Sequence, residues 1–432
     1  MPKQASQFAP GRRQLLAAGA ALGGLALAGC AGVPAGQLSG PSIGRVVVIG
    51  GGFGGSTAAR YLRLWGGNVD VTLVERQAGF VSCPLSNLVL GGYRQMADIS
   101  RSYDSLVALG VKRVQAEVSA IDVAGKQVRL DNGSVLAYDR LIVSPGVDFM
   151  ADQVPGLAAA LASGQVLHAW KAGPQTLALR QQLQDMPDGG VFALCIPKSP
   201  FRCPPGPYER ACVVANYLQQ AKPRSKLLVM DANPEIQSKK ALFERAFAQR
   251  YPGILEYRPN AELKEVAGKL ARFDFEDVLA DVLNVVPPQR AADLVRGAGL
   301  VNVVNRWVGV NWLSLESSVA PGIHVLGDAT FSAPAMPKSG HMANQHAKVA
   351  AAAVIQLLKG EAVNASPLVM NTCYSFVSAH EAIHVASVHP YNAAENTFKT
   401  VPGSGGVSAS ASLLEGRYAQ AWADNIWHDM LG

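Results

Sequence analysis

The sequence lacks the patterns that mark several large classes of protein. After residue 30, no apolar run reaches the ~18 residues of a transmembrane helix, so we expect none in the mature chain. No basic run is present, and the formal net charge of +6 falls to +3 without Lys3, Arg12 and Arg13, which argues against a nucleic-acid partner. Cys-x-x-Cys-His is also missing, so we expect no covalent haem on this chain.

Cysteine is scarce, and its number is informative. The sequence has six cysteines, and Cys30 lies in the N-terminal segment described next. The remaining five are Cys83, Cys195, Cys203, Cys212 and Cys373. An oxidising compartment pairs thiols, so an odd number leaves one thiol that is either free or occupied by another group.

Residues 1–30 have the pattern of an export signal. Arg12-Arg13 precedes the uncharged run 15–28, which is short and rich in small residues. Paired arginines are typical of the twin-arginine route, which exports folded proteins, so we expect the periplasm as the location. Two cleavage sites fit. The lipobox-like Leu27-Ala-Gly-Cys30 would leave a lipid anchor on Cys30, and ordinary cleavage would follow Ala35.

A glycine-rich turn between a strand and a helix predicts dinucleotide binding. The apolar run 45–49 leads into Gly50, Gly52 and Gly55, which occupy the glycine positions of G-x-G-x-x-G, and residues 56–64 then have a helical pattern. The first glycine permits the tight turn, the second lets backbone N–H groups approach a pyrophosphate, and the third lets the helix pack on its strand.

A second strand completes this motif. Residues 69–74 are expected to form the strand, and Glu75 follows, 25 residues after Gly50, where an acid takes the ribose hydroxyls. Arg76 is expected to lie at the same cofactor site.

A distant segment favours FAD over NAD. Residues 111–117 and 121–130 are predicted strands with a turn at 131–133, and 138–146 is a further strand. The run 322–329 then returns as a strand ending in Gly327-Asp328, the pair that meets the ribityl and phosphate part of FAD in proteins of this architecture. Lys338 and Gly340 precede a predicted helix over 342–359, whose N-terminal dipole would stabilise an anionic reduced flavin.

A second α/β unit is expected to have lost its nucleotide site. Residues 191–196 and 226–231 are predicted strands, joined by a helix over 207–220. The turn 197–207 between them contains five prolines and one glycine, and prolines cannot offer the backbone N–H groups that a pyrophosphate needs. We therefore expect no reaction with NAD(P)H.

The last 70 residues are expected to form a separate cap with two strands and a C-terminal helix over 413–431. Aromatic residues along this helix could face a membrane, but packing on the protein is the preferred interpretation. His380-Glu-Ala-Ile-His384 matches the zinc motif H-E-x-x-H, yet it falls between two strand-like runs, so we expect a hairpin connection and no metal site. His341 and His346 are expected to form hydrogen bonds near the flavin.

These patterns together predict an α/β fold with two Rossmann-like, glutathione reductase-like, three-layer domains and a small α+β C-terminal cap. The predicted parts are the signal 1–30, a discontinuous FAD domain of 43–165 and 285–361, a degenerate nucleotide-binding-like domain of 166–284, and the cap 362–432.

Four motifs resemble the flavoprotein subunit of flavocytochrome c sulfide dehydrogenase, across essentially the whole mature length. They are the N-terminal FAD fingerprint, Ser82-Cys-Pro-Leu-Ser-Asn87, Arg202-Cys-Pro-Pro-Gly-Pro-Tyr-Glu-Arg210 and Asn371-Thr-Cys-Tyr-Ser375. The lipobox-like Cys30 departs from that family.

The resemblance implies a role for several residues. Cys83 would carry FAD covalently, Cys203 and Cys373 would form a redox-active disulfide, and Glu209 would move protons beside it. A thioether on Cys83 would also explain the odd cysteine count. Cys195 and Cys212 would then be either a second pair or two buried thiols, and we expect buried thiols.

The resemblance also implies a function. We expect oxidation of hydrosulfide to sulfane sulfur through the disulfide and FAD, with a separate cytochrome c subunit as electron acceptor. The alternatives are a sulfide:quinone oxidoreductase and a non-catalytic FAD electron-relay subunit.

Overall fold

A six-stranded sheet organises the first part of the fold. The computed structural model describes residues 41–432, and the predicted signal 1–30, with Cys30, lies outside them. The strand order is β19-β20-β9-β1-β2-β5, parallel except for β19. The strands are β1 (Gly44–Ile49), β2 (Val69–Val74), β5 (Lys112–Val114), β9 (Arg140–Val143), β19 (Glu316–Ser317) and β20 (Ala320–Val325).

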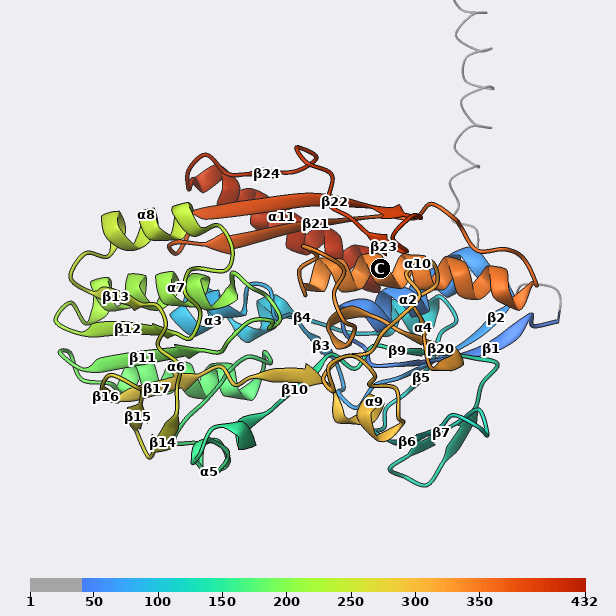
Figure 1. Ribbon diagram of the computed structural model, residues 1–432, viewed down its shortest axis with the longest axis horizontal. Helices are drawn as coiled ribbons and strands as arrows, with labels where there is room; N and C mark the ends of the chain where they lie inside the picture. The colour runs from blue at the N-terminus through green and yellow to red at the C-terminus, as the bar shows by residue number, and fades with distance from the viewer. Residues whose placement is uncertain (1–40) are drawn as a thin grey trace, which may run out of the picture. The chain divides into compact units, whose positions relative to one another are not determined.

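Both faces of this sheet are covered, because its apolar strands bury side chains on each side. Helices α2 (Phe53–Gly66) and α10 (Gly340–Leu358) pack together on one face (Figure 1). The opposite face is covered by a three-stranded sheet and a short helix. These elements are β6 (Val118–Asp122), β7 (Gln127–Leu130), β8 (Val135–Ala137) and α9 (Asp293–Gly297).

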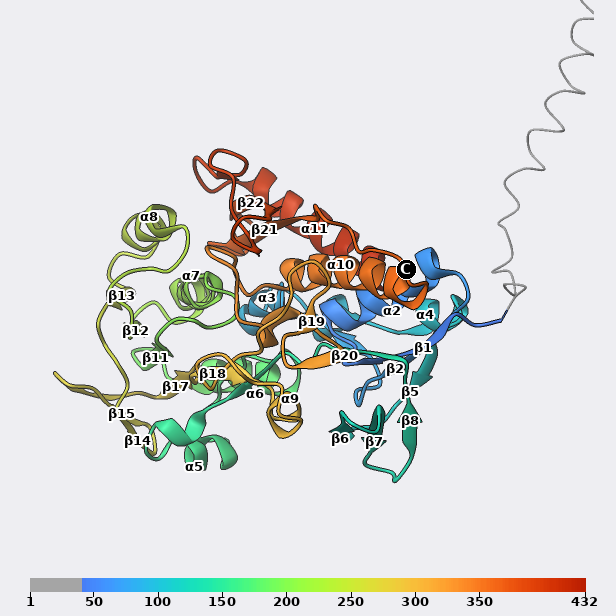
Figure 2. The same cartoon turned by 45° about the vertical axis from the view of Figure 1, so that its right-hand side comes forward.

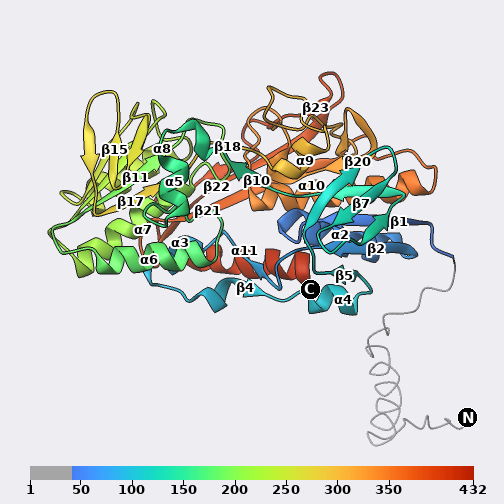
Figure 3. The same ribbon diagram turned by 90° about the horizontal axis from the view of Figure 1, so that it is seen from below.

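A second, four-stranded parallel sheet has the order β13-β12-β11-β17. Three helices cover one face, and a helix with a small antiparallel sheet covers the other. Two of the three helices, α6 and α7, lie side by side in the view from below (Figure 3). The strands are β11 (Val191–Ile196), β12 (Lys226–Asp231), β13 (Leu255–Arg258) and β17 (Val282–Val285). The covering elements are α6 (Pro174–Asp185), α7 (Gly206–Ala221) and α8 (Lys240–Arg250), then α5 (Leu157–Ala162), β14 (Glu265–Ala267), β15 (Leu270–Arg272) and β16 (Asp277–Leu279).

The C-terminal segment connects these two parts. Strand β21 (Leu368–Phe376) pairs antiparallel with β22 (Ala382–Asn392), and β21 contacts both α7 and α10 (Figures 1 and 2). Short strands β23 (Thr397–Phe398) and β24 (Gly406–Val407) pair with β22, and α11 (Leu413–Leu431) packs against α2 and β22.

The remaining elements are short. They are β3 (Phe80–Val81) paired with β4 (Ser100–Arg101), β10 (Val147–Phe149) paired with β18 (Gln289–Ala291), helices α3 (Ser86–Gly91) and α4 (Asp104–Ala108), and 3-10 turns η2 (Met96–Ile99), η3 (Ala151–Gln153) and η4 (Gly327–Ala329). No helix within residues 41–432 combines the length and apolar character needed to cross a bilayer.

The predicted fold class is confirmed, and the helix over 413–431 has the predicted bounds. One predicted strand is wrong: residues 121–130 form the end of β6, a turn and then β7. Gly125 lies in this turn, where its N–H donates to Asp122 Oδ1 at 2.8 Å, and such Asx turns interrupt a strand. The division into domains stays a prediction, because residues 40–432 form one unit by their contacts.

Candidate active site

A cavity of about 1110 Å³ brings the predicted site residues together. Its wall includes parts of the first sheet, the turn between β11 and α7, the start of α10 and strand β21. The predicted residues on it are Gly50, Gly52, Glu75, Arg76, Cys83, Cys203, Glu209, Gly327, Asp328, Lys338, Gly340 and Cys373. Gly55 is the one predicted site residue that does not line this cavity.

The backbone geometry at the three motif glycines is compatible with the predicted roles. Gly50 has a φ of 94°, which a side chain would disfavour, and it makes the turn after β1. A Cβ at Gly52 would meet nothing within 4 Å, so this backbone is open to an approaching group. A Cβ at Gly55 would lie 1.7 Å from Gly50 O, so only glycine lets α2 pack this close to its strand.

Glu75 and Arg76 follow β2 as predicted, although both already have partners. The Glu75 carboxylate accepts hydrogen bonds of 2.7 Å from the N–H groups of Gly51 and Gln77. Arg76 forms an ion pair with Glu117 at 2.9 Å, and both side chains are about half exposed. Glu75 therefore holds the glycine turn, and its bond to Gly51 would have to rearrange or be shared when it meets a ribose.

The Gly327–Lys338 segment supplies a second polar wall. Gly327 has a φ of 72°, and burial raises the pKa of Asp328 while Arg202 and Lys338 oppose that shift. Asp328 Oδ1 is buried without a hydrogen-bond partner. Lys338 donates to the carbonyls of Asp328 and Thr330 and lies 3.9 Å from the centre of the Trp307 ring. Burial lowers the pKa of Lys338 to about 7.

Cys83 lies in the short loop between β3 and α3. Arg202 Nη2 lies 3.2 Å from its sulfur. Burial alone would raise the pKa of Cys83, but the Arg202 charge and the hydrogen bonds from Ala172 and Arg202 lower it overall. A thiol with a lowered pKa beside a guanidinium is a reactive one.

Cys203 and Cys373 are adjacent although they are 170 positions apart in the sequence. Cys203 lies in the proline-rich turn with a φ of 55°, and its N–H donates to Lys338 O at 2.7 Å. Both are free thiols on the wall of the same cavity. Their interaction raises the pKa of Cys203 and lowers the pKa of Cys373 to about 7. Their disulfide stays a prediction.

Glu209 is buried in the first turn of α7. Phe376 N–H and Asn87 Nδ2 donate to its two oxygens, both at 2.8 Å. Burial raises its pKa, although these two donors and the charges of Lys239 and Arg210 act in the opposite direction. It can therefore hold a proton at a higher pH than an exposed glutamate.

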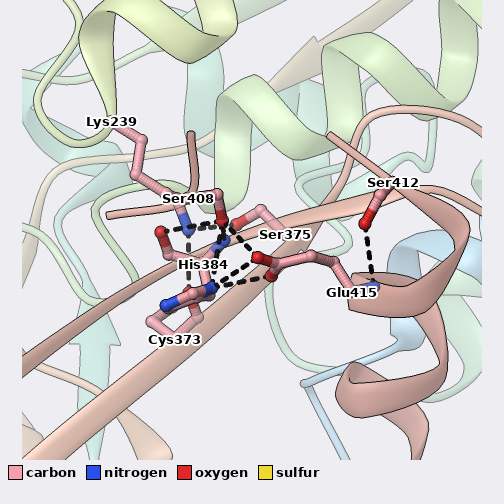
Figure 4. A network of polar contacts seen from close by, with 7 residues as sticks. All are labelled: Lys239, Cys373, Ser375, His384, Ser408, Ser412 and Glu415. Carbon is pink, nitrogen blue, oxygen red and sulfur yellow. Dashed lines mark hydrogen bonds and ion pairs between the residues drawn. The ribbon is translucent and has the colours of Figure 1, made fainter. Parts of the chain in front are cut away.

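Lys239 is a site residue that sequence analysis missed. Its ammonium group donates to Cys373 O and Ser375 Oγ, both at 2.9 Å (Figure 4). Its charge helps to lower the pKa of Cys373, while burial lowers its own. In the sequence, Lys239 belongs to a Ser-Lys-Lys run after β12 that matches no site motif, so this contact could not be predicted.

Arg202 and Arg210, which flank the Cys203 motif, are also cavity residues whose roles were not predicted. Arg210 is almost fully buried and donates to Asn87 Oδ1, Asn284 Oδ1 and the carbonyls of His168 and Ala169. The sequence indicated only that both arginines lie at the ends of the Arg202–Arg210 motif that contains Cys203.

A second polar cluster joins the cap strands to α11. His384 Nδ1 lies 2.7 Å from a Glu415 oxygen and 3.0 Å from Ser408 Oγ (Figure 4). Because Glu415 and Ser408 meet the same ring nitrogen, this is not a Ser-His-Glu catalytic arrangement. His380 and Glu381 lie in the connection between β21 and β22, as predicted, so H-E-x-x-H is not helical. No cluster of three metal-binding side chains occurs among residues 41–432.

The other predicted residues lie as follows. Cys195 and Cys212 are free, buried thiols on opposite faces of the second sheet, which keeps them from pairing. His341 Nδ1 accepts from Thr372 N–H, and His346 Nδ1 accepts from Gly327 N–H. On α11, Ile426 and Trp427 are buried and Trp422 lines the cavity, in agreement with packing on the protein.

The cavity residues fit an FAD. The open backbone at Gly52 and the N-terminus of α2 suit a pyrophosphate. The unpartnered Asp328 Oδ1 suits a hydroxyl donor of the ribityl chain. The volume exceeds the upper end of the ~300–1,000 Å³ of common ligand sites, as a molecule of this length requires.

Three family models match the chain. Residues 44–185 match "Pyridine nucleotide-disulphide oxidoreductase", 176–287 match "Sulfide dehydrogenase [flavocytochrome c] flavoprotein chain, central", and 365–431 match "Flavocytochrome c sulphide dehydrogenase, flavin-binding".

Known proteins resemble the chain to different extents. The "Sulfide dehydrogenase [flavocytochrome c] flavoprotein chain" of Chlorobaculum thiosulfatiphilum is 58% identical over 45 residues, which cover 10% of this chain and 94% of that protein. A mitochondrial sulfide:quinone oxidoreductase of Mus musculus is 24% identical over 315 residues, and the match covers 66% of this chain and 65% of the mouse protein. The solved structure of the sulfide:quinone oxidoreductase from Aquifex aeolicus shares the fold, with a TM-score of 0.73 at 19% identity over 90% of this chain and 91% of that one.

Proposed function

Because the chain belongs to the family of flavocytochrome c sulfide dehydrogenase flavoprotein chains, we propose that it oxidises hydrosulfide to sulfane sulfur with FAD as its cofactor. One observation carries the proposal. The thiols of Cys203 and Cys373 meet in the same cavity as the glycine turn and Gly327-Asp328. A cysteine pair beside a flavin site is the arrangement needed to collect two electrons from a sulfur substrate.

The proposed reaction begins with the oxidised cysteine pair. Hydrosulfide attacks the Cys203 sulfur, a new S–S bond forms there, and the Cys203–Cys373 bond breaks. Cys373 leaves as a thiolate with the electron pair of the broken bond, and the attacking sulfur gives up its proton. Cys373 is the better leaving group because its pKa is lowered to about 7, whereas that of Cys203 is raised.

The surrounding residues support this step. Lys239 fixes the backbone at Cys373 and favours its thiolate. We propose that Glu209, a buried carboxyl whose charge raises the pKa of both sulfurs, takes up the proton that the attacking sulfur releases. When bound, FAD supplies the two-electron acceptor that makes the reaction an oxidation.

The finer details of the proposal come from the family and the N-terminus. We propose that Cys83 holds FAD covalently, that a cytochrome c subunit accepts the electrons, and that the Arg12-Arg13 signal directs the protein to the periplasm. Among the cavity thiols, Cys83 is the one that Arg202 activates by direct contact.

The test is sulfide-dependent reduction of cytochrome c by the purified protein. Cys203→Ser and Cys373→Ser should each abolish turnover while flavin stays bound, because either change removes the disulfide. Cys195→Ser is the control, since Cys195 lies in a separate core, and it should retain activity. Turnover near that of the wild type in either active-site variant would favour a non-catalytic electron relay.

Quinone is the second candidate acceptor, because the mouse relative and the Aquifex aeolicus structure are sulfide:quinone oxidoreductases. The two acceptors separate in one assay, in which the same protein and sulfide are mixed with either a soluble quinone or cytochrome c. Faster reduction of the quinone would favour quinone over cytochrome c as the electron acceptor.

A further inference from the structure

Two buried N–H donors on the cavity wall have no acceptor. Trp170 is 6% exposed, and its indole Nε1 forms no hydrogen bond. The Nε of Arg202 is likewise buried without a partner. Both residues line the cavity. Buried donors nearly always have a hydrogen-bond partner in folded proteins, so two donors without acceptors on a cavity wall point to a ligand.

These donors lie beside Cys203. A Cβ placed on Gly206 would be 2.9 Å from Cys203 Sγ, 2.8 Å from Trp170 Cη2 and 3.3 Å from Trp170 Cζ2. The six-membered ring of the Trp170 indole and the Cys203 sulfur therefore flank the same glycine. Arg202 precedes Cys203 in the chain and donates to Trp170 O, which ties its guanidinium to the tryptophan.

The charge of this wall is positive and is not neutralised by ion pairing. Arg210 Cζ lies 4.8 Å from the centre of the Trp170 ring. None of the ion pairs formed within residues 41–432 includes Arg202, Arg210, Lys239 or Lys338, although all four line the cavity or contact Cys373. Buried cations that form no ion pair with a carboxylate favour an anionic ligand.

We propose that Trp170 and Arg202 form a subsite for an anionic sulfur chain on Cys203, whose terminal sulfur accepts hydrogen bonds from Trp170 Nε1 and Arg202 Nε. The inference rests on the proposed function, in which hydrosulfide leaves its sulfur on Cys203. A persulfide ends in a polarizable anion one bond beyond the cysteine sulfur. Glycine at 206 lets the Cys203 sulfur and the indole approach each other, because a Cβ there would lie within 3.0 Å of both.

This subsite has a chemical consequence. Hydrogen bonds to the terminal sulfur stabilise the anionic persulfide, so it persists until a second hydrosulfide arrives.

The experiment loads Cys203 directly, without turnover. In flavin-loaded Cys373→Ser, sodium tetrasulfide transfers one sulfur to the Cys203 thiolate. One S–S bond of tetrasulfide breaks, a Cys203 persulfide forms, and trisulfide leaves. Intact-protein mass spectrometry gives the loaded fraction, and peptide mapping confirms Cys203 as the site. Adding Trp170→Phe should raise the tetrasulfide concentration for half-loading about tenfold or more, the usual effect of losing a hydrogen bond to a charged group.

Trp427→Phe is a matched control. Trp427 is also buried, its Nε1 also lacks a partner, and Arg101 stacks on its ring with Cζ 4.0 Å from the centre, but it does not line the cavity. Its loading curve should equal that of the parent. Equal loading of the Trp170→Phe protein would overturn the subsite, and so would loss of flavin from it, because Nε1 would then serve the cofactor.

The two proposals fail separately. Wild-type protein that does not oxidise sulfide would contradict the proposed function. Wild-type protein that oxidises sulfide, together with loading unaffected by Trp170→Phe, would contradict the subsite alone.

Discussion

The two thiols at the centre of the cavity differ in acidity, and the difference comes from their neighbours. Interaction between the two thiols raises the pKa of Cys203 and lowers that of Cys373, and Lys239 adds a positive charge on the Cys373 side. In the reduced protein, the negative charge is therefore favoured on Cys373. In the proposed reaction, this difference makes Cys203 the attacked sulfur and Cys373 the departing one.

This asymmetry predicts the pH dependence of alkylation. In the reduced protein, the rate at which iodoacetamide modifies Cys373 should rise with pH through about 7, because only the thiolate reacts and its pKa is lowered to that value. Cys203 should react only at higher pH. Mass spectrometry of the two cysteine peptides over a pH series gives both curves.

Lys239→Met should move the Cys373 curve to higher pH, since it removes a cation that stabilises the thiolate. Lys240→Met is the control, because Lys240 is exposed and pairs with Glu235 at 2.7 Å. If the two variants gave the same Cys373 curve as the wild type, Lys239 would have no electrostatic role at this sulfur.

Cys83 should carry the flavin covalently. Its contact with Arg202 favours the reactive thiolate, and its position in the cavity places it at the cofactor site. After acid precipitation, the flavin of the wild-type protein should remain in the pellet, and that of Cys83→Ala should appear in the supernatant. Free flavin from the wild type would show that Cys83 has another role.

At the scale of elements, the turn between β11 and α7 lacks the phosphate site of a nucleotide-binding unit and carries cavity residues instead. In a nucleotide-binding βαβ unit this turn holds a pyrophosphate at the helix N-terminus. Here Pro207 removes a backbone N–H from the first turn of α7, and the buried Glu209 carboxyl lies in that turn. The same turn carries Cys203 into the cavity.

This difference predicts that pyridine nucleotides do not reduce the protein. Stopped-flow mixing of the holoprotein with NADH or NADPH should leave the absorbance of the oxidised flavin unchanged, because the turn offers no phosphate site. Sulfide mixed in the same instrument is the positive control. Rapid bleaching by either nucleotide would contradict the interpretation of the turn.

A structural feature could be predicted from the sequence where all the residues that determine it lie in one short segment. The strand, glycines, helix and second strand of residues 45–75 were correct, because each glycine has a local steric reason. The break at Gly125 was missed, since apolar residues continue on both sides of it. Lys239 and Trp170 could not be found from the sequence, because their roles come from contacts with segments far along the chain.

At the scale of the whole molecule, the export route that we propose would require assembly to come first. The twin-arginine route carries folded proteins, so it would suit a protein that takes up its cofactor in the cytoplasm. Replacing Arg12 and Arg13 by lysines should trap a precursor in the cytoplasm, which cell fractionation and immunoblotting would show. Normal export of that variant would mean that the general secretory route is used.

The position of β21 sets the order in which the site is completed. Cys373, Phe376 N–H and Ser375 Oγ reach Cys203, Glu209 and Lys239 only after the C-terminal strands have docked between α7 and α10. A ribosome has made most of the chain before it synthesises these residues. Under the proposed mechanism, the nascent protein therefore cannot react with sulfide at this cysteine pair until nearly all of it has been translated.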